Sequence, residues 1–171
     1  MKLVKLAIIS FIFLFALVTT ISLFIPSGIR ISKAANFAPG YKDVLQPISD
    51  LSGWRDWHPA LKDIPANEFE VLTDSIIKIR STTISIKKKT GDEVIAEMSA
   101  DKGRPIMSGF KLINHQAGDS TTLQCYMDFK LRWYPWEKFR SLFYENIYGI
   151  QMEQGLANLK GLAEAHRSSS N

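Results

Sequence analysis

A segment of strict alternation, Thr121 to Trp133, places the strongest constraint on how this chain folds. One face of the segment is apolar and the other is polar, as the two-residue period of a pleated strand requires. The apolar face holds Leu123, Cys125, Met127, Phe129, Leu131 and Trp133, and the other holds Gln124, Asp128, Lys130 and Arg132. The segment therefore predicts a strand in a sheet with one buried face.

The period changes after Pro135 and predicts a long amphipathic helix near the end of the chain. Met152, Leu156, Leu159 and Ala163 recur at helical spacings of three and four, so they form one stripe. Such a helix can cover the apolar face of the sheet. A sheet curled around one helix can enclose an apolar space, which is where small hydrophobic ligands are usually held.

The N-terminus carries an uncharged apolar run, Leu6 to Ile25, without Pro or Gly. A run of about twenty residues matches a hydrocarbon core about 30 Å thick, whereas a signal peptide has an apolar region of about 7–15 residues. We interpret residues 1–28 as an uncleaved transmembrane anchor, with residues 6–25 in the membrane, and favour it over a signal peptide or a buried core helix. The short leading segment favours a single-pass orientation with the domain outside the cytoplasm, in the periplasm if the source is a Gram-negative bacterium.

Charge and cysteine content exclude several classes of function. The chain has 21 Lys and Arg; without Lys2 and Lys5 of the anchor, 19 remain against 17 Asp and Glu, a net charge of +2. That excess is too small to indicate a nucleic-acid partner. The basic cluster Lys87 to Lys89 leads into a Gly-Asp turn and is typical of a solvated hairpin end. The single Cys125 cannot form an internal disulfide.

The remaining residues, 29–167, have the length of one domain, and 168–171 read as a disordered tail. A slip in the apolar phase near Ser81 to Thr83 predicts a bulge or break that bends the sheet. A run of antiparallel strands between helical segments predicts an α+β fold. The predicted strands are 29–37, 68–73, 75–88, 93–101, 105–116 and 120–133, and the predicted helices are 41–49, 54–59, a bridge over 135–148, and the C-terminal helix.

Three short motifs occur in a characteristic order along residues 29–165. They are the Ala38-Pro39 turn after the first strand, Asp50-Leu51 followed by Trp54-x-x-Trp57-x-Pro59, and Gly149 followed by the helix that starts near Met152. This succession resembles the START-like, Bet v 1-like helix-grip superfamily, also called SRPBCC, and within it the bacterial polyketide cyclase/dehydrase-like proteins, including members with an N-terminal membrane segment.

The resemblance implies a curved antiparallel sheet wrapped around a long C-terminal helix, with two short helices after the first strand. It also implies a hydrophobic cavity between the sheet and the helix. It does not imply a reaction, because the superfamily includes sterol and lipid carriers, plant hormone receptors and aromatase/cyclases, and fold alone does not choose among them.

Catalysis in such a cavity would need acid and base groups that face inward. On the alternating strand the inward set contains only Cys125, and on the preceding strand Ser108 faces inward while His115 faces outward. His58 follows two tryptophans and is the best candidate. It shares no metal-binding motif with His115 or His166, so we expect no metal site and no cofactor.

We therefore predict a membrane-anchored domain that binds a hydrophobic small molecule or lipid without covalent chemistry. Its expected partners are that ligand and the membrane, with no nucleic acid, and a protein partner is left open. Two alternatives remain: a polyketide cyclase/dehydrase-like enzyme, and a tethered protein-interaction module whose core is filled by the same residues. The candidate ligand-binding residues are Tyr41, Trp54, Trp57, His58, Phe110, Met127, Phe129, Met152 and Leu156, with Tyr41 or His58 supplying the polar contact.

Overall fold

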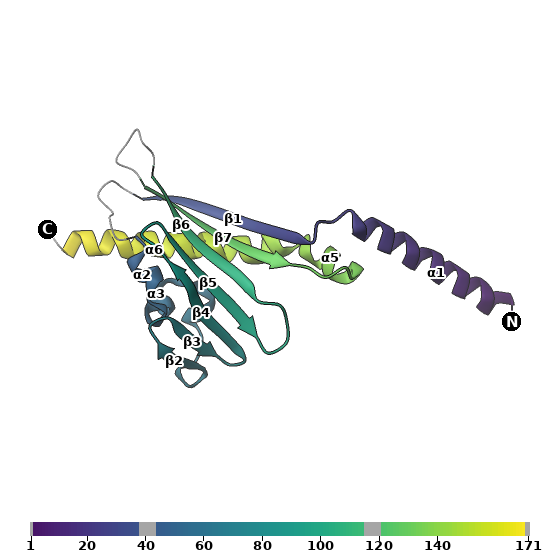
Figure 1. Ribbon diagram of the computed structural model, residues 1–171, viewed down its shortest axis with the longest axis horizontal. Helices are drawn as coiled ribbons and strands as arrows, with labels where there is room; N and C mark the ends of the chain where they lie inside the picture. The colour runs from purple at the N-terminus through teal and green to yellow at the C-terminus, as the bar shows by residue number, and fades with distance from the viewer. Residues whose placement is uncertain (1, 38–43, 115–120, 170–171) are drawn as a thin grey trace.

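The computed structural model describes residues 2–37, 44–114 and 121–169 (Figure 1). Its elements are α1 (Lys2–Leu23), β1 (Gly28–Phe37), α2 (Gln46–Ser49), η1 (Leu51–Gly53), α3 (Trp54–Trp57), α4 (Pro59–Lys62), η2 (Ala66–Glu68), β2 (Phe69–Thr73), β3 (Ile76–Ile79), β4 (Thr82–Lys89), β5 (Glu93–Ala100), β6 (Ile106–Asn114), β7 (Thr121–Lys130), α5 (Pro135–Ser141), the π-helix η3 (Glu145–Gly149) and α6 (Ile150–Ser169). The helix α6 extends two residues into the segment 168–171 that the sequence predicts as a tail.

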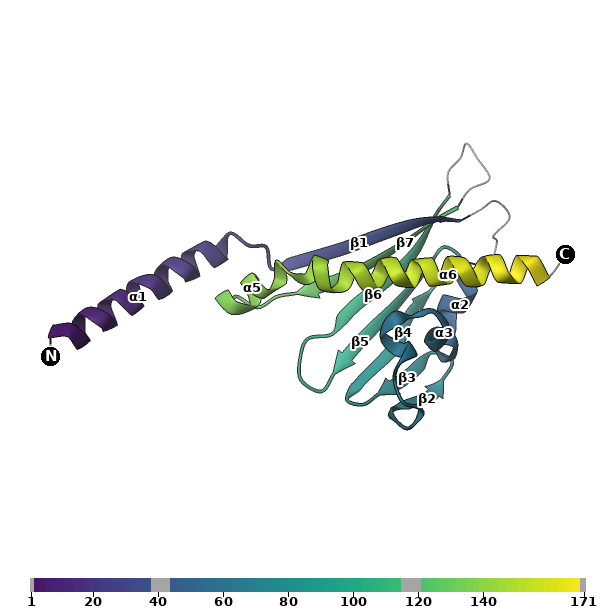
Figure 2. The same cartoon turned by 180° about the vertical axis from the view of Figure 1, so that it is seen from behind.

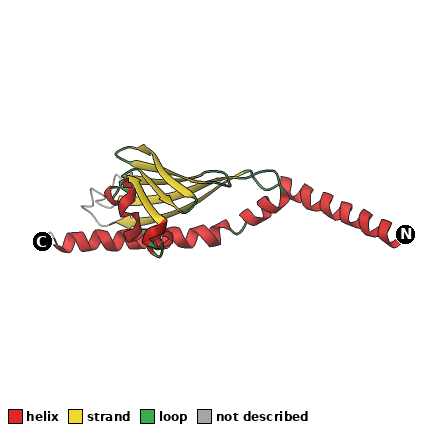
Figure 3. Ribbon diagram, turned by 90° about the horizontal axis from the view of Figure 1, so that it is seen from below, coloured by secondary structure: helices red, strands yellow, loops and turns green. Residues whose placement is uncertain are grey.

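The strands form one seven-stranded antiparallel sheet in the order β1-β7-β6-β5-β4-β3-β2. From β2 to β7 each strand pairs with the next along the chain, and β1 closes the other edge by pairing with β7. Figure 2 shows α6 running across one face of the sheet, and Figure 3 shows the sheet arching over it. The predicted α+β helix-grip architecture is confirmed.

The predicted phase slip marks a break, and the single strand predicted over 75–88 is wrong. Strand β3 ends at Ile79 and β4 begins at Thr82, and these two residues pair across a tight hairpin. Arg80 in this turn has a φ of 53°, in the left-handed region. Its guanidinium also forms an ion pair with Glu68. The apolar phase slips because the chain reverses between two strands.

The two prolines near the short helices begin them. Pro47 and Pro59 stand in the first turns of α2 and α4, where a missing N–H removes no hydrogen bond. The single helix predicted over 54–59 is therefore divided at His58, whose extended backbone ends α3 and precedes α4. This division places the His58 side chain at the corner between two helices.

Strand β7 ends at Lys130, three residues before the predicted end at Trp133. Leu131 is still buried and its N–H donates to the carbonyl of Ser27 at 2.7 Å. Trp133 then leaves the sheet as the chain turns toward Pro135 at the start of α5. Its side chain is 62% exposed, so its predicted place on the buried face is wrong.

Within the described residues, α1 is the one helix long and apolar enough to cross a membrane. Figures 1 and 2 show it projecting away from the sheet. Thr19 and Thr20 donate their hydroxyls to the carbonyls of Phe15 and Ala16, each at 2.8 Å. These hydroxyls are therefore satisfied within the helix, as an apolar environment requires.

Candidate functional site

Two tryptophans on the single turn of α3 form an aromatic cluster with Phe110 of β6. Trp54 and Trp57 are three residues apart and share a face, with ring centroids 5.2 Å apart. Phe110 lies edge-on to each ring at 5.8 Å. The indole N–H of Trp54 donates to the carbonyl of Ile48 at 2.9 Å, and that of Trp57 to Pro47 at 3.3 Å. The cluster fixes the short helices against the inner face of the sheet.

His58 completes this cluster and introduces a polar group. Its imidazole stacks on Trp54 with a centroid distance of 5.6 Å and an interplanar angle of 3°. Its Nδ1 is buried and has no hydrogen-bond partner in the described part of the chain. Burial lowers the pKa of His58 to about 4, so the ring is neutral near pH 7. An unpaired buried nitrogen costs about 1–3 kcal/mol, which a bound hydrogen-bonding group would recover.

The long helix α6 closes the site from the other side. Met152, Leu156 and Leu159 are buried on its inner face. Gly155 lies against α3 and α4, where an added Cβ would meet Pro59 Cδ at 3.4 Å and the Trp57 ring at 3.6 Å. The amide of Asn158 donates to the carbonyl of Trp57 at 2.8 Å. The helix therefore contacts the aromatic cluster directly.

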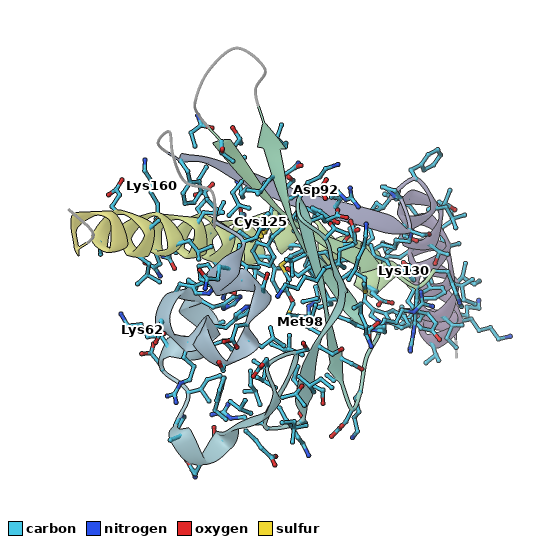
Figure 4. The ribbon with its side chains drawn as sticks, turned by 60° about the vertical axis from the view of Figure 1, so that its left-hand side comes forward. Lys62, Asp92, Met98, Cys125, Lys130 and Lys160 are labelled. Carbon is cyan, nitrogen blue, oxygen red and sulfur yellow. The ribbon has the colours of Figure 1, made fainter. Side chains whose placement is uncertain are left out.

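The strands β6 and β7 supply the wall opposite α6. Phe110 pairs in register with Cys125, and Ser108 pairs with Met127. All four side chains are buried. Burial raises the pKa of the Cys125 thiol, which is labelled in Figure 4, to about 12. In these two pairs the only polar side-chain groups are therefore the hydroxyl of Ser108 and the neutral thiol of Cys125.

A second aromatic group lies where β7 ends. The Phe129 ring is 4.8 Å from each of the Tyr144 and Tyr148 rings. Beside it is a pocket of about 120 Å³, lined by Arg104, Pro105, Ile106, Phe129, Lys130, Leu131, Glu137 and Tyr144. That volume is below the usual lower limit of about 300 Å³ for ligand pockets. The sequence predictions missed both tyrosines, although their separation of four on a helical segment is a signal for a shared face.

The structure brings together eight of the nine predicted ligand-binding residues. Seven belong to one buried apolar cluster: Trp54, Trp57, Phe110, Met127, Phe129, Met152 and Leu156. His58 stacks on that cluster, and Tyr41 lies outside the described residues. Their role in binding stays a prediction. In the described ranges, no group of three His, Cys, Asp or Glu side chains could hold a metal ion.

No protein-family model and no curated protein matches the chain. Among solved structures, a START superfamily protein from Mycobacterium smegmatis superposes with a TM-score of 0.55 at 15% identity, over 80% of this chain and 97% of that chain. The chain has the START-like, Bet v 1-like helix-grip fold. The sequence resemblance is thus confirmed for the fold.

Two further solved structures share this START-like fold. The di-domain ARO/CYC StfQ from the steffimycin biosynthetic pathway has a TM-score of 0.60 at 10% identity, over 82% of this chain, which spans 52% of that di-domain protein. A point mutant of Thalictrum flavum norcoclaurine synthase, in complex with a transition-state analogue, has a TM-score of 0.57 at 12% identity, over 82% of this chain and 96% of that one. Identities this low establish the fold and leave function to the site.

Proposed function

We propose that this chain is a membrane-anchored START-like domain that binds a hydrophobic small molecule or lipid between the sheet and α6, without covalent chemistry. The observation that carries the proposal is the buried, unpartnered Nδ1 of His58 among the rings of Trp54 and Trp57. Buried polar groups are nearly always paired, and a filled apolar core gains nothing from an unpaired one. A mostly apolar ligand with one hydrogen-bonding group would pair it.

The character of the inner wall supports binding over catalysis. On β6 and β7 the buried polar side chains of the pairs described above are Ser108 and Cys125. Burial raises the pKa of Cys125 to about 12. General acid-base catalysis works best with groups whose pKa lies near the working pH. Neither this thiol nor His58, with a pKa of about 4, meets that condition.

The membrane part of the proposal rests on α1. We infer that α1 spans the bilayer with its Lys2 and Lys5 end inside and the START-like domain outside the cytoplasm, since basic residues at the end of a span favour the cytoplasmic side. A thiol-reactive, membrane-impermeant reagent applied to intact cells should label an exposed cysteine introduced by Lys62→Cys. Labelling only after the cells are permeabilised would contradict this orientation.

The binding proposal is tested by isolating the full-length chain in mild detergent and identifying bound apolar species by native mass spectrometry and solvent extraction. Met127→Trp adds bulk to the inner face of β7, and Gln124→Trp adds the same bulk to its outer face. We expect a reproducible species with the wild type and with Gln124→Trp, and its loss with Met127→Trp. If Met127→Trp fails to fold, His58→Phe provides the second test. It keeps an aromatic ring but removes Nδ1, so it should weaken retention of the bound species.

The binding proposal fails if the wild type yields no species and shows no thermal shift with fatty acids, isoprenoids or aromatic polyketides. That result would favour the interaction module with a filled core, because seven of the predicted residues already pack together. A ligand retained equally by the wild type and by Met127→Trp would place binding outside the inner face of β7.

A cyclase/dehydrase-like enzyme is the second candidate, with the same imidazole as its candidate acid or base. A bound substrate would first have to raise the pKa of His58 from about 4 toward neutrality. Two of the structural neighbours carry the names of an ARO/CYC protein and a synthase. Comparing the wild type with His58→Gln distinguishes binding from catalysis. If His58→Gln still retains the ligand while the wild type alone converts it, the enzyme proposal holds.

A further inference from the structure

An exposed apolar face lies on the helical segment between the sheet and the main length of α6. Six large apolar side chains form it, with exposed fractions from 47% to 64%: Trp133, Trp136, Leu142, Phe143, Ile147 and Ile150. We call this set the outer apolar face. Trp136 lies on α5, Phe143 in the turn after it, Ile147 on η3 and Ile150 at the start of α6. A cluster of large exposed apolar side chains of this kind marks a protein or membrane contact.

The outer apolar face adjoins the end of the anchor. The side chain of Ser22, in the last turn of α1, is fully buried, and α1 contacts α5. Lys138 of α5 donates from Nζ to the carbonyl of Ile25 at 2.6 Å and to the hydroxyl of Ser27 at 2.8 Å. Figures 1, 2 and 3 all show α5 beside the C-terminal end of α1. The segment that carries the face is therefore fixed beside the C-terminal end of α1.

The connection between anchor and domain is too short to separate them. Four residues, 24–27, join Leu23 at the end of α1 to Gly28 at the start of β1. Even when fully extended, the five steps from Leu23 to Gly28 reach only about 18 Å. The hydrogen bonds of Lys138 shorten this reach further, because they bind the connection to α5. The start of the outer apolar face thus stays close to the C-terminal end of α1.

The composition of the segment also fits a lipid surface. Residues 130–150 contain four basic side chains against two acidic ones, Glu137 and Glu145. Lys138 is buried against Ile25 and Ser27, which leaves Lys130, Arg132 and Arg140 as the basic side chains available to a lipid surface. The carboxylate of Glu145 is engaged by Lys33 at 2.7 Å. Exposed tryptophans beside arginines are characteristic of the membrane–water interface, where the rings meet the acyl boundary and the cations meet anionic headgroups.

We propose that the outer apolar face is embedded in the interfacial layer of the bilayer that α1 spans, so that the domain rests on the membrane through α5 and η3. This inference rests on the anchoring part of the proposed function and is independent of ligand binding. The occupant of the face is the lipid surface. A second copy of the chain is the competing occupant.

The test uses the full-length chain reconstituted in vesicles of phosphatidylcholine and phosphatidylglycerol. Single cysteines are introduced by Phe143→Cys and Ile147→Cys on the face, by Ile12→Cys within α1, and by Leu72→Cys on β2, the strand at the sheet edge opposite β1. Each is labelled with an environment-sensitive fluorophore and exposed to nitroxide-labelled lipids. The native thiol of Cys125 is buried and does not compete for the label.

We expect lipid quenching of the labels at positions 143, 147 and 12, with the label at 72 unquenched. If the labels at 143 and 147 behave like the one at 72 while the label at 12 is quenched, the face is not embedded although the anchor is. If the label at 12 also escapes quenching, the anchoring proposal fails and the inference falls with it. A signal at 143 that grows with the protein-to-lipid ratio and ignores the nitroxide lipids identifies a second copy as the occupant and overturns the inference.

Discussion

Replacing His58 by phenylalanine should remove a specific part of the acid sensitivity of the fold. Burial lowers the pKa of His58 from 6.5 to about 4 in the folded chain, while the unfolded chain keeps the ordinary value. Between these two values the unfolded state binds more protons, so stability is lost as the pH falls. The loss amounts to about 2 kcal/mol at about pH 5 and about 3 kcal/mol below about pH 4. These are upper values, because His58 as a residue is only partly buried.

The matched comparison isolates this contribution. Phenylalanine keeps a ring against Trp54 and does not titrate, so the carboxylates and the remaining histidines act equally in both proteins. Relative to the His58→Phe variant, the wild type should lose about 4–8 °C in Tm between about pH 7.5 and pH 5. Thermal unfolding followed by tryptophan fluorescence, with the full-length chain in detergent, measures this difference. Parallel Tm curves for the two proteins would refute the buried, unpaired imidazole, and with it the observation that carries the proposed function.

Three further substitutions or treatments test other parts of the structure. An added Cβ at Gly109 would lie 2.0 Å from Cζ of Tyr126, so Gly109→Ala should lower the free energy of unfolding by about 1–3 kcal/mol. Tyr126→Ala should remove most of that penalty in a double-mutant cycle followed by urea unfolding; equal penalties in both backgrounds would contradict the contact. Cys125 should resist iodoacetamide in the native chain at neutral pH, because burial raises its pKa to about 12, and it should react in denaturant. Intact-mass measurement reads the modification. Modification of the folded chain at the rate of a free thiol would show that the thiol is exposed. Lys138→Met leaves the carbonyl of Ile25 without its donor, so it should raise amide hydrogen exchange in residues 24–28. Exchange in β5 should stay unchanged. Unaltered exchange in both regions would mean that Lys138 does not hold the connection between α1 and β1.

Periodicity predicts most of this fold because each face of a strand meets a single environment. Five of the six residues predicted on the inner face of β7, from Leu123 to Leu131, are buried, and α6 buries Met152, Leu156 and Leu159 as its stripe predicts. The tryptophan pair of α3 also lies on a shared, buried face. The prolines show the limit of this reasoning, since Pro59 marks the division of a helical segment whether it ends one helix or begins the next.

Side-chain contacts between residues far apart in the sequence could not be predicted from local patterns. Lys33 alternates in phase with the apolar Ile31 and Ala35 in the predicted strand 29–37, and the structure gives it ion pairs with Glu145 at 2.7 Å and Glu153 at 2.8 Å. These pairs raise the pKa of Lys33 and join β1 to η3 and α6. Lys138 reaches the carbonyl of Ile25 across 113 positions of sequence. Such pairs depend on where the sheet and helices meet, which a local pattern does not contain.

The outer apolar face shows a deeper limit, because an apolar stripe reports an apolar environment without saying which one. Phe143 and Ile147 are spaced like the core residues of α6, yet they are 61% and 47% exposed. The same segment turns Tyr144 and Tyr148 toward Phe129, beside the pocket that Arg104 and Lys130 border. Neighbouring residues of one segment therefore belong to the surface proposed to meet lipid and to the interior proposed to bind a hydrophobic ligand. If both proposals hold, a ligand that arrives from the bilayer meets α5 and η3 first. Its route into the domain would then run past Phe129, at the end away from His58. Entry of the ligand would depend on the residues around Phe129, and its retention on His58.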